Sequence, residues 1–369
     1  MNEDLFGPLL GNAVSLAAIG VSSALAVHGA TRLRSGPEET LPERYFAWGR
    51  KRSGLGGASL AVVLVVGQWQ ALWLVPVWFV AMSLSTYRVG KELFSETWTF
   101  GRFLLFRFGC FVSLYVFRLL LLLGPVVVAL AGSSRFGSAI FLGVVLVVFA
   151  QNATDLFLLV VGARKLDSPA APLLVDVVSR SSHPMPRLLV STPRGGRFAN
   201  AFALPEPKRP AVVFGGTLVS ALSSEELAAI FAHEMAHLEH FRARTRRRQV
   251  SFFLLAIGAT VVPAMVADRL PGAAVPYAIA WTVGMIVSLS RIARRRRAQE
   301  ADCDRRAVAL CGNPETLVRA LEKLHALALL PSRFDPRIEP KLSHPSLVDR
   351  IEAIRESAAR EPEGSRAAS

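Results

Sequence analysis

The sequence predicts an α-helical membrane protein that carries a small α+β domain, split in two by a transmembrane hairpin. Of its 369 residues, 52% are hydrophobic, and the mean hydropathy of +0.39 is too high for an ordinary soluble protein. Several apolar stretches approach or exceed the roughly 18 residues that a membrane-spanning helix needs. After Gly162 the composition becomes that of a globular domain, with 13 basic residues between Arg164 and Arg248.

Residues 1–162 are predicted to form an N-terminal membrane region with about four apolar segments. The first eight residues contain Glu3 and Asp4 and no basic residue, which favours a retained first span over a cleaved signal peptide. The four segments cover Leu9–Ala30, Ser59–Leu84, residues 103–131 and residues 138–161.

The net charge of +14 is explained by arginines that gather at the ends of apolar segments and in the loops between them. Basic and aromatic residues are not interleaved as in nucleic-acid-binding proteins. We therefore expect a lipid bilayer, and no nucleic acid, as a partner. Three cysteines without a CxxC pair argue against a disulfide framework or a cysteine zinc site, and they favour a reducing compartment.

Residues 163–248 are predicted to form the first part of the globular domain. Ala170–Ser181 is typical of a helix, and three short runs are typical of strands: Arg187–Ser191, Phe198–Leu204 and Ala211–Phe214. A helix is expected over Ser223–Arg242, because Ser223 and Glu226 have the spacing of a capping box.

This helix contains the sequence His-Glu-Met-Ala-His, with His233, Glu234 and His237. Two histidines four residues apart lie about 40° apart around a helix axis, so both imidazoles can reach one metal ion. Glu234 falls within the apolar stripe of the helix. A carboxylate on a buried face is costly unless it is paired or linked to a metal, which favours a functional site over a chance match.

Residues 249–291 are predicted to form a transmembrane hairpin, made of Val250–Val266 and Gly272–Ser290. Two crossings return the chain to the side from which it left. Residues 292–360 are expected to be the second part of the globular domain, built from helices, and residues 361–369 a disordered tail.

A catalytic zinc site needs a third protein ligand and one open position. Glu300 is the candidate, since the hairpin returns it to the side of the two histidines. His240 is the alternative, but it lies on the same straight helix, where tetrahedral convergence is difficult. Asp304, one helical turn after Glu300, is expected to orient a ligand histidine through a hydrogen bond.

The order of these motifs resembles the membrane zinc metallopeptidases of the HtpX type and the related CAAX prenyl proteases. HExxH, a transmembrane hairpin and ExxxD follow one another in that order. The segments Asn200–Leu204 and Ala211–Gly216 also resemble the family's NAFA segment and following strand, and Ser343–Ile351 its closing HPxxxxRI motif. Cys303 stands where the family usually has an alanine.

The resemblance implies a gluzincin-type metallopeptidase domain with one zinc ion per chain. His233, His237 and Glu300 would bind the zinc, and Glu234 would be the catalytic base. His344 and Arg350 match positions that face the cleft and support the substrate or the developing oxyanion. The remaining expected site residues form an edge strand that pairs with an extended substrate: Asn200, Ala211, Val212, Val213 and Phe214.

These features together predict a membrane-embedded, zinc-dependent endopeptidase that cleaves membrane-associated or misfolded polypeptides, with Glu234 activating a zinc-bound water. The alternatives are a processing protease for one specific substrate, such as a lipidated one, a BlaR-like sensor-transducer, and a non-catalytic zinc scaffold.

The expected location is the bacterial cytoplasmic membrane, with the active site facing the cytoplasm. The basic loop of residues 31–57 favours a cytoplasmic position for that loop. Four full crossings would then place the globular part outside. We therefore expect residues 103–131 or 138–161 to be re-entrant or interfacial.

Overall fold

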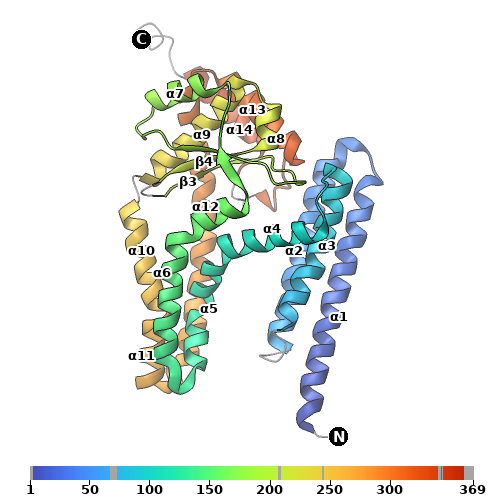
Figure 1. Cartoon of the computed structure of the whole chain (residues 1–369), viewed down its shortest axis with the longest axis vertical. Coiled ribbons are helices and arrows are strands. Elements are labelled where there is room, and N and C mark those ends of the chain that lie inside the picture. Colours follow the sequence, from blue (N-terminus) through green and yellow to red (C-terminus); the bar gives the residue numbers. More distant parts are fainter. Residues whose placement is uncertain are drawn as a thin grey trace. The chain divides into compact units, whose positions relative to one another are not determined.

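The computed structural model describes residues 3–66, 73–206, 209–242, 245–339, 342 and 344–360. The predicted disordered tail, residues 361–369, lies outside this range. The chain forms two compact units, shown in Figure 1. The first comprises Met1–Arg107, Pro193–Arg197 and His325–Pro331, and the second comprises Phe108–Thr192, Phe198–Leu324 and Ser332–Ser369.

The first unit is built on three packed helices, α1 (Glu3–Thr31), α2 (Leu41–Val66) and α3 (Leu74–Phe94). Short 3-10 turns at Arg32–Arg34 and Glu38–Thr40 join α1 to α2. Two contacts between helices fix their packing. The Trp48 indole donates to the Ala26 carbonyl at 2.9 Å, and the Ser23 hydroxyl donates to the Ala81 carbonyl at 2.9 Å.

The prediction of a single span over Ser59–Leu84 is wrong. The Trp78 indole nitrogen lies 3.1 Å from the Ser59 hydroxyl oxygen, whereas a continuous helix would separate these residues by about 28 Å. The chain therefore reverses between α2 and α3, although residues 67–72 themselves lie outside the described range.

Helix α4 (Phe100–Phe111) continues through one π-helical turn, Val112–Val116, into α5 (Phe117–Leu130). The second unit contains two helical hairpins. The first is α5 with α6 (Arg135–Val160), and the second is α10 (Thr245–Ala259) and α11 (Val261–Arg269) with α12 (Ala274–Cys311).

The two hairpins pack on each other through a core that includes Leu121, Leu146 and Ala259, and the Trp281 indole donates to the Leu121 carbonyl at 2.8 Å. Both hairpins turn at the end away from the small sheet (Figure 1). The second arm of the predicted hairpin and the helix of Glu300 are one continuous helix, because no helix breaker separates Ser290 from Arg296.

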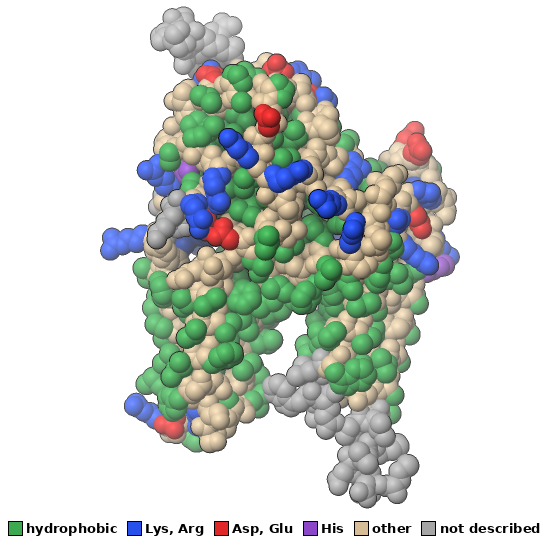
Figure 2. Space-filling view, viewed as in Figure 1, with side chains coloured by type: hydrophobic (Ala, Val, Ile, Leu, Met, Phe, Trp, Pro, Cys, Tyr) green, Lys and Arg blue, Asp and Glu red, His purple; other side chains and the backbone are tan. Residues whose placement is uncertain are grey.

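Five helices among the described residues are long and apolar enough to cross a membrane. They include Phe100–Leu130 and Gly132–Val160, so both stretches are long enough to cross, and a re-entrant or interfacial position for one of them stays a prediction. Outward side chains such as Ile140 and Phe141 are 70% and 72% exposed, as expected for groups that face lipid. Figure 2 shows hydrophobic side chains over these helices.

The sheet of the second unit has the strand order β1-β2-β4-β3. Strands β2 and β4 are parallel, and the other two pairs are antiparallel. The strands are β1 (Ala163–Lys165), β2 (Arg187–Ser191), β3 (Ala201–Leu204) and β4 (Ala211–Gly215). The remaining helices are α7 (Ala171–Ser179), α8 (Gly216–Ala221), α9 (Ser224–Arg242), α13 (Pro314–Ala328) and α14 (Leu347–Arg360).

The prediction that Ala211, Val212, Val213 and Phe214 form an edge strand is wrong. Strand β4 pairs with β2 on one side and β3 on the other, and all four side chains are fully buried. The edge of the sheet next to β4 is therefore β3. Asn200 immediately precedes β3, and its carbonyl accepts the Gly215 N–H at 2.7 Å.

Candidate metal centre

Helix α9 begins with the predicted capping box. The Ser223 N–H donates to the Glu226 carboxylate at 2.8 Å, and the Glu226 N–H donates to the Ser223 hydroxyl at 3.2 Å. Lys323 also donates to Glu226 at 2.7 Å. Almost every side chain from Glu226 to Leu238 is buried, which fixes the rotation of the helix and hence the direction of its histidines.

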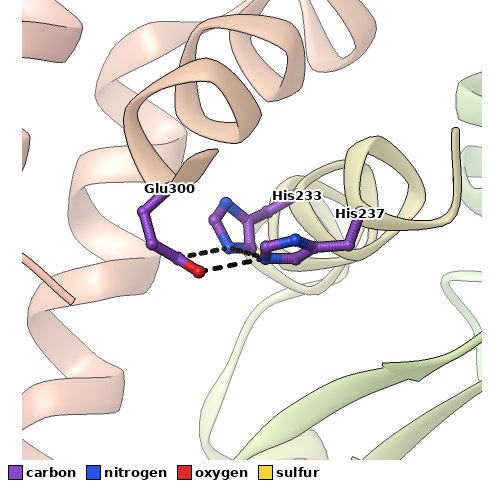
Figure 3. Close-up of side chains that lie close together, drawn as sticks. All are labelled: His233, His237 and Glu300. Atoms are coloured by element: carbon purple, nitrogen blue, oxygen red, sulfur yellow. Dashed lines mark hydrogen bonds and ion pairs between the residues drawn. The ribbon is translucent and has the colours of Figure 1, made fainter. Parts of the chain in front are cut away.

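His233 and His237 of α9 converge with Glu300 of α12 (Figure 3). Their Nε2 atoms lie 3.2 Å apart. Each Nε2 lies 3.5 Å from one oxygen of the Glu300 carboxylate. One donor atom from each residue falls within 4.8 Å of the others, and among the described residues the group does not include His240.

The donor set fits a divalent cation. Two imidazole nitrogens that face each other and a carboxylate on the same side provide three lone pairs directed at one volume. The buried Glu300 Oε2 has no well-aligned hydrogen-bond donor in the protein. Two histidines with one glutamate are also the ligand set of open, catalytic zinc sites.

Asp304 and Arg350 form a layer behind the histidines. Asp304 Oδ1 lies 2.9 Å from His233 Nδ1, although the N–H is not well aligned with it. The Arg350 guanidinium donates to both Asp304 oxygens, at 2.8 Å and 2.7 Å, and both side chains are buried. Two of its three nitrogens thus bind Asp304, and the role of Arg350 in supporting the substrate or the developing oxyanion stays a prediction.

Glu234 is 7% exposed and lies beside the two histidines on α9. Burial raises the pKa of this carboxyl group, while the neighbouring His233 and the backbone N–H of Ala203 oppose the rise. Ala203 belongs to the edge strand β3. Glu234, the predicted catalytic base, therefore lies between the two histidines and the edge strand β3.

Two further side chains contact the candidate ligands. His344 is largely exposed, and its Nδ1 lies 3.0 Å from Glu300 Oε2, while its neighbour Ser343 lies outside the described residues. Cys303 is 1% exposed, and its Sγ lies 3.3 Å from His237 Nδ1. Sequence reasoning did not find the Cys303 contact, although its i+3 spacing from Glu300 places it on the side of α12 that faces α9.

Comparisons with known proteins identify the chain as a relative of membrane peptidases. Residues 158–358 match the sequence profile of peptidase family M48, which is more than half of the chain. The chain belongs to peptidase family M48. It is also 29% identical over 264 residues to a protein named "Protease HtpX homolog" from Nostoc punctiforme, covering 61% of this chain and 87% of that protein.

Among solved structures, the crystal structure of S. mikatae Ste24p matches with a TM-score of 0.58 and 16% sequence identity. The match covers 95% of this chain and 99% of that one, and it shows a shared fold. The chain is an integral membrane M48 peptidase of the HtpX and Ste24 kind, as its motifs predicted.

The two histidines of this M48 site are expected to differ in protonation. Burial alone would lower the pKa of His233, but the hydrogen bonds and charges of Asp304 and Glu300 outweigh burial and raise this pKa to about 9. Burial and then the charge of His233 lower the pKa of His237 to about 4. In the metal-free protein at pH 7, His237 is therefore neutral and His233 is charged.

Metal binding is consequently expected to release about one proton per chain at pH 7, since a ligand imidazole must be neutral. The apparent affinity should rise about tenfold per pH unit below pH 9 and level off above it. Isothermal titration calorimetry in buffers of different ionisation enthalpy measures the released proton directly. A binding enthalpy that does not depend on the buffer would contradict the assigned charge of His233.

Proposed function

We propose that this M48 protein is a zinc endopeptidase that cleaves membrane-associated or misfolded polypeptides, bound in extended form along β3. The observation that carries the proposal is the convergence of His233, His237 and Glu300 beside a buried Glu234. When bound, zinc polarises the scissile carbonyl and acidifies a water molecule. Glu234 accepts the proton of that water and passes it to the leaving amine.

The outer edge of β3 supports binding of an extended peptide. The Asn200 carbonyl points toward β4, so alternation along the strand directs the backbone groups of Ala201 and Ala203 away from the sheet. The outward carbonyls of Ala201 and Ala203 can pair with a substrate backbone by strand addition, whereas the Ala201 N–H donates to Asn200 Oδ1 at 3.0 Å. The Ala203 N–H is hydrogen-bonded to Glu234, so a substrate paired with the carbonyls of β3 would lie next to the base.

The distribution of arginines supports a cytoplasmic active site. The ends of α10 and α12 near the globular part carry exposed arginines: Arg246, Arg247, Arg248, Arg291, Arg295 and Arg296. The opposite turns carry Arg135 and Arg269, next to Asp268. Figure 2 shows basic side chains gathered where these helices meet the globular part. The excess of arginine at that end favours its retention in the cytoplasm.

The test is zinc content and casein cleavage of the purified, detergent-solubilised chain and of Glu300→Gln. We expect about one zinc per wild-type chain and a loss of both zinc and cleavage in Glu300→Gln, because the amide is a far weaker zinc ligand than the carboxylate. Glu352→Gln, an exposed change on α14, is the control and should behave as wild type. A wild-type chain that binds zinc but cleaves nothing would favour a scaffold or a sensor.

A further inference from the structure

Helix α12 presents three side chains with donor or acceptor atoms to the histidine pair of α9. Glu300, Cys303 and Asp304 are spaced i, i+3 and i+4, so they lie on one side of the helix. Glu300 faces the Nε2 atoms, and the other two face the Nδ1 atoms. Asp304 Oδ1 lies 2.9 Å from Nδ1 of His233, and Cys303 Sγ lies 3.3 Å from Nδ1 of His237.

An imidazole that binds a metal through Nε2 carries its remaining proton on Nδ1. The side chains of His233 and His237 are only 9% and 16% exposed, and a donor that is withdrawn from water without an acceptor is destabilising. For His237 the facing atom is the sulfur of Cys303, which can accept a hydrogen bond, although weakly. The acceptor behind a ligand histidine fixes both its tautomer and the orientation of its ring.

We propose that Cys303 is a positioning residue, whose sulfur accepts a hydrogen bond from Nδ1–H of His237 and so holds Nε2 toward the metal. This inference rests on the zinc site proposed above. It makes the pair of histidines asymmetric, because His233 is backed by a carboxylate bound to Arg350 and His237 by a thiol.

Two observations exclude other roles for this thiol. The donor atoms that could share one cation lie on the Nε2 side of the histidines, and among the described residues that group does not contain Cys303. Its side chain is also 1% exposed, so no substrate can reach it as a nucleophile. The role that remains for the Cys303 thiol is its contact with His237.

The experiment measures zinc affinity of the full chain in detergent by competition with a chromophoric chelator. The variants are Cys303→Ala, Cys303→Ser and Cys303→Val, with Cys311→Ala as the control about 12 Å further along the same helix. We expect about tenfold weaker binding in Cys303→Ala and Cys303→Val, since neither offers an acceptor, and binding within about threefold of wild type in Cys303→Ser. The visible spectrum of the Co²⁺-substituted protein should change in the same two variants only.

Wild-type affinity and an unchanged Co²⁺ spectrum in Cys303→Ala would overturn the inference and leave the zinc site standing. Wild-type affinity in Cys303→Val would also overturn it, because the residue would then act by filling space. If the wild type itself binds no zinc, the proposed function fails together with this inference. The thermal midpoint of each metal-free variant shows whether the chain is folded before zinc is added.

Discussion

Replacing Glu234 by glutamine is expected to leave the metal bound and to reduce cleavage about a thousandfold or more. Glutamine preserves the volume of a side chain that is almost fully buried, so packing against the sheet is retained. It cannot accept a proton, however, and removal of a general base typically costs a factor of about 10² to 10⁴ in rate. The measurement is kcat/KM on a fluorogenic peptide together with zinc content of the same sample.

Glu225→Gln is the matched control, because Glu225 lies on the first turn of the same helix and is exposed. It should keep wild-type cleavage and zinc content. If Glu234→Gln cleaves at the wild-type rate, Glu234 is not the base. If Glu234→Gln loses the zinc as well as cleavage, Glu234 belongs to the ligand set, and the assignment of separate roles to Glu234 and the two histidines is wrong.

Those features that depend on local sequence could be predicted. The HExxH helix follows from helical spacing and its capping box, and Glu300 follows from the parity of the hairpin, which returns the chain to one side of the membrane. The i+4 position of Asp304 follows from the same helical geometry. In each case the signal lies within one helix or one hairpin.

Features that depend on packing between distant segments could not be predicted in the same way. The apolar run of Ser59–Leu84 continues through a chain reversal, so hydropathy does not reveal that α2 and α3 are two helices. Strand order in the sheet is not the order in the sequence, and β4 lies between β2 and β3. The motif that contains Arg350 indicates that the residue matters, but it does not indicate which group the side chain contacts. In the structure the Arg350 guanidinium binds Asp304, 46 residues away in the sequence.

Arg350→Met is expected to lower the free energy of unfolding by about 3–5 kcal/mol, because it removes the guanidinium that binds both oxygens of the buried Asp304 carboxylate and leaves it only His233 as a partner. Methionine keeps much of the volume of the arginine, so the loss comes mainly from the charge. Chemical denaturation of the detergent-solubilised chain measures it. Arg355→Met is the matched control on the same helix, since Arg355 makes an equally bidentate pair with Glu315 at the exposed surface, and it should lose far less stability.

The double variant Arg350→Met with Asp304→Asn distinguishes a buried pair from two independent residues. Removing both charges should cost less than the sum of the single changes, because the penalty in Arg350→Met is that of a buried carboxylate that has lost its bidentate partner. Additive losses would show that the two side chains are not coupled. A positioning role further requires weaker zinc binding in folded Asp304→Asn, since His233 Nδ1 would lose its charged partner at 2.9 Å, whereas a purely structural pair would leave the zinc affinity unchanged.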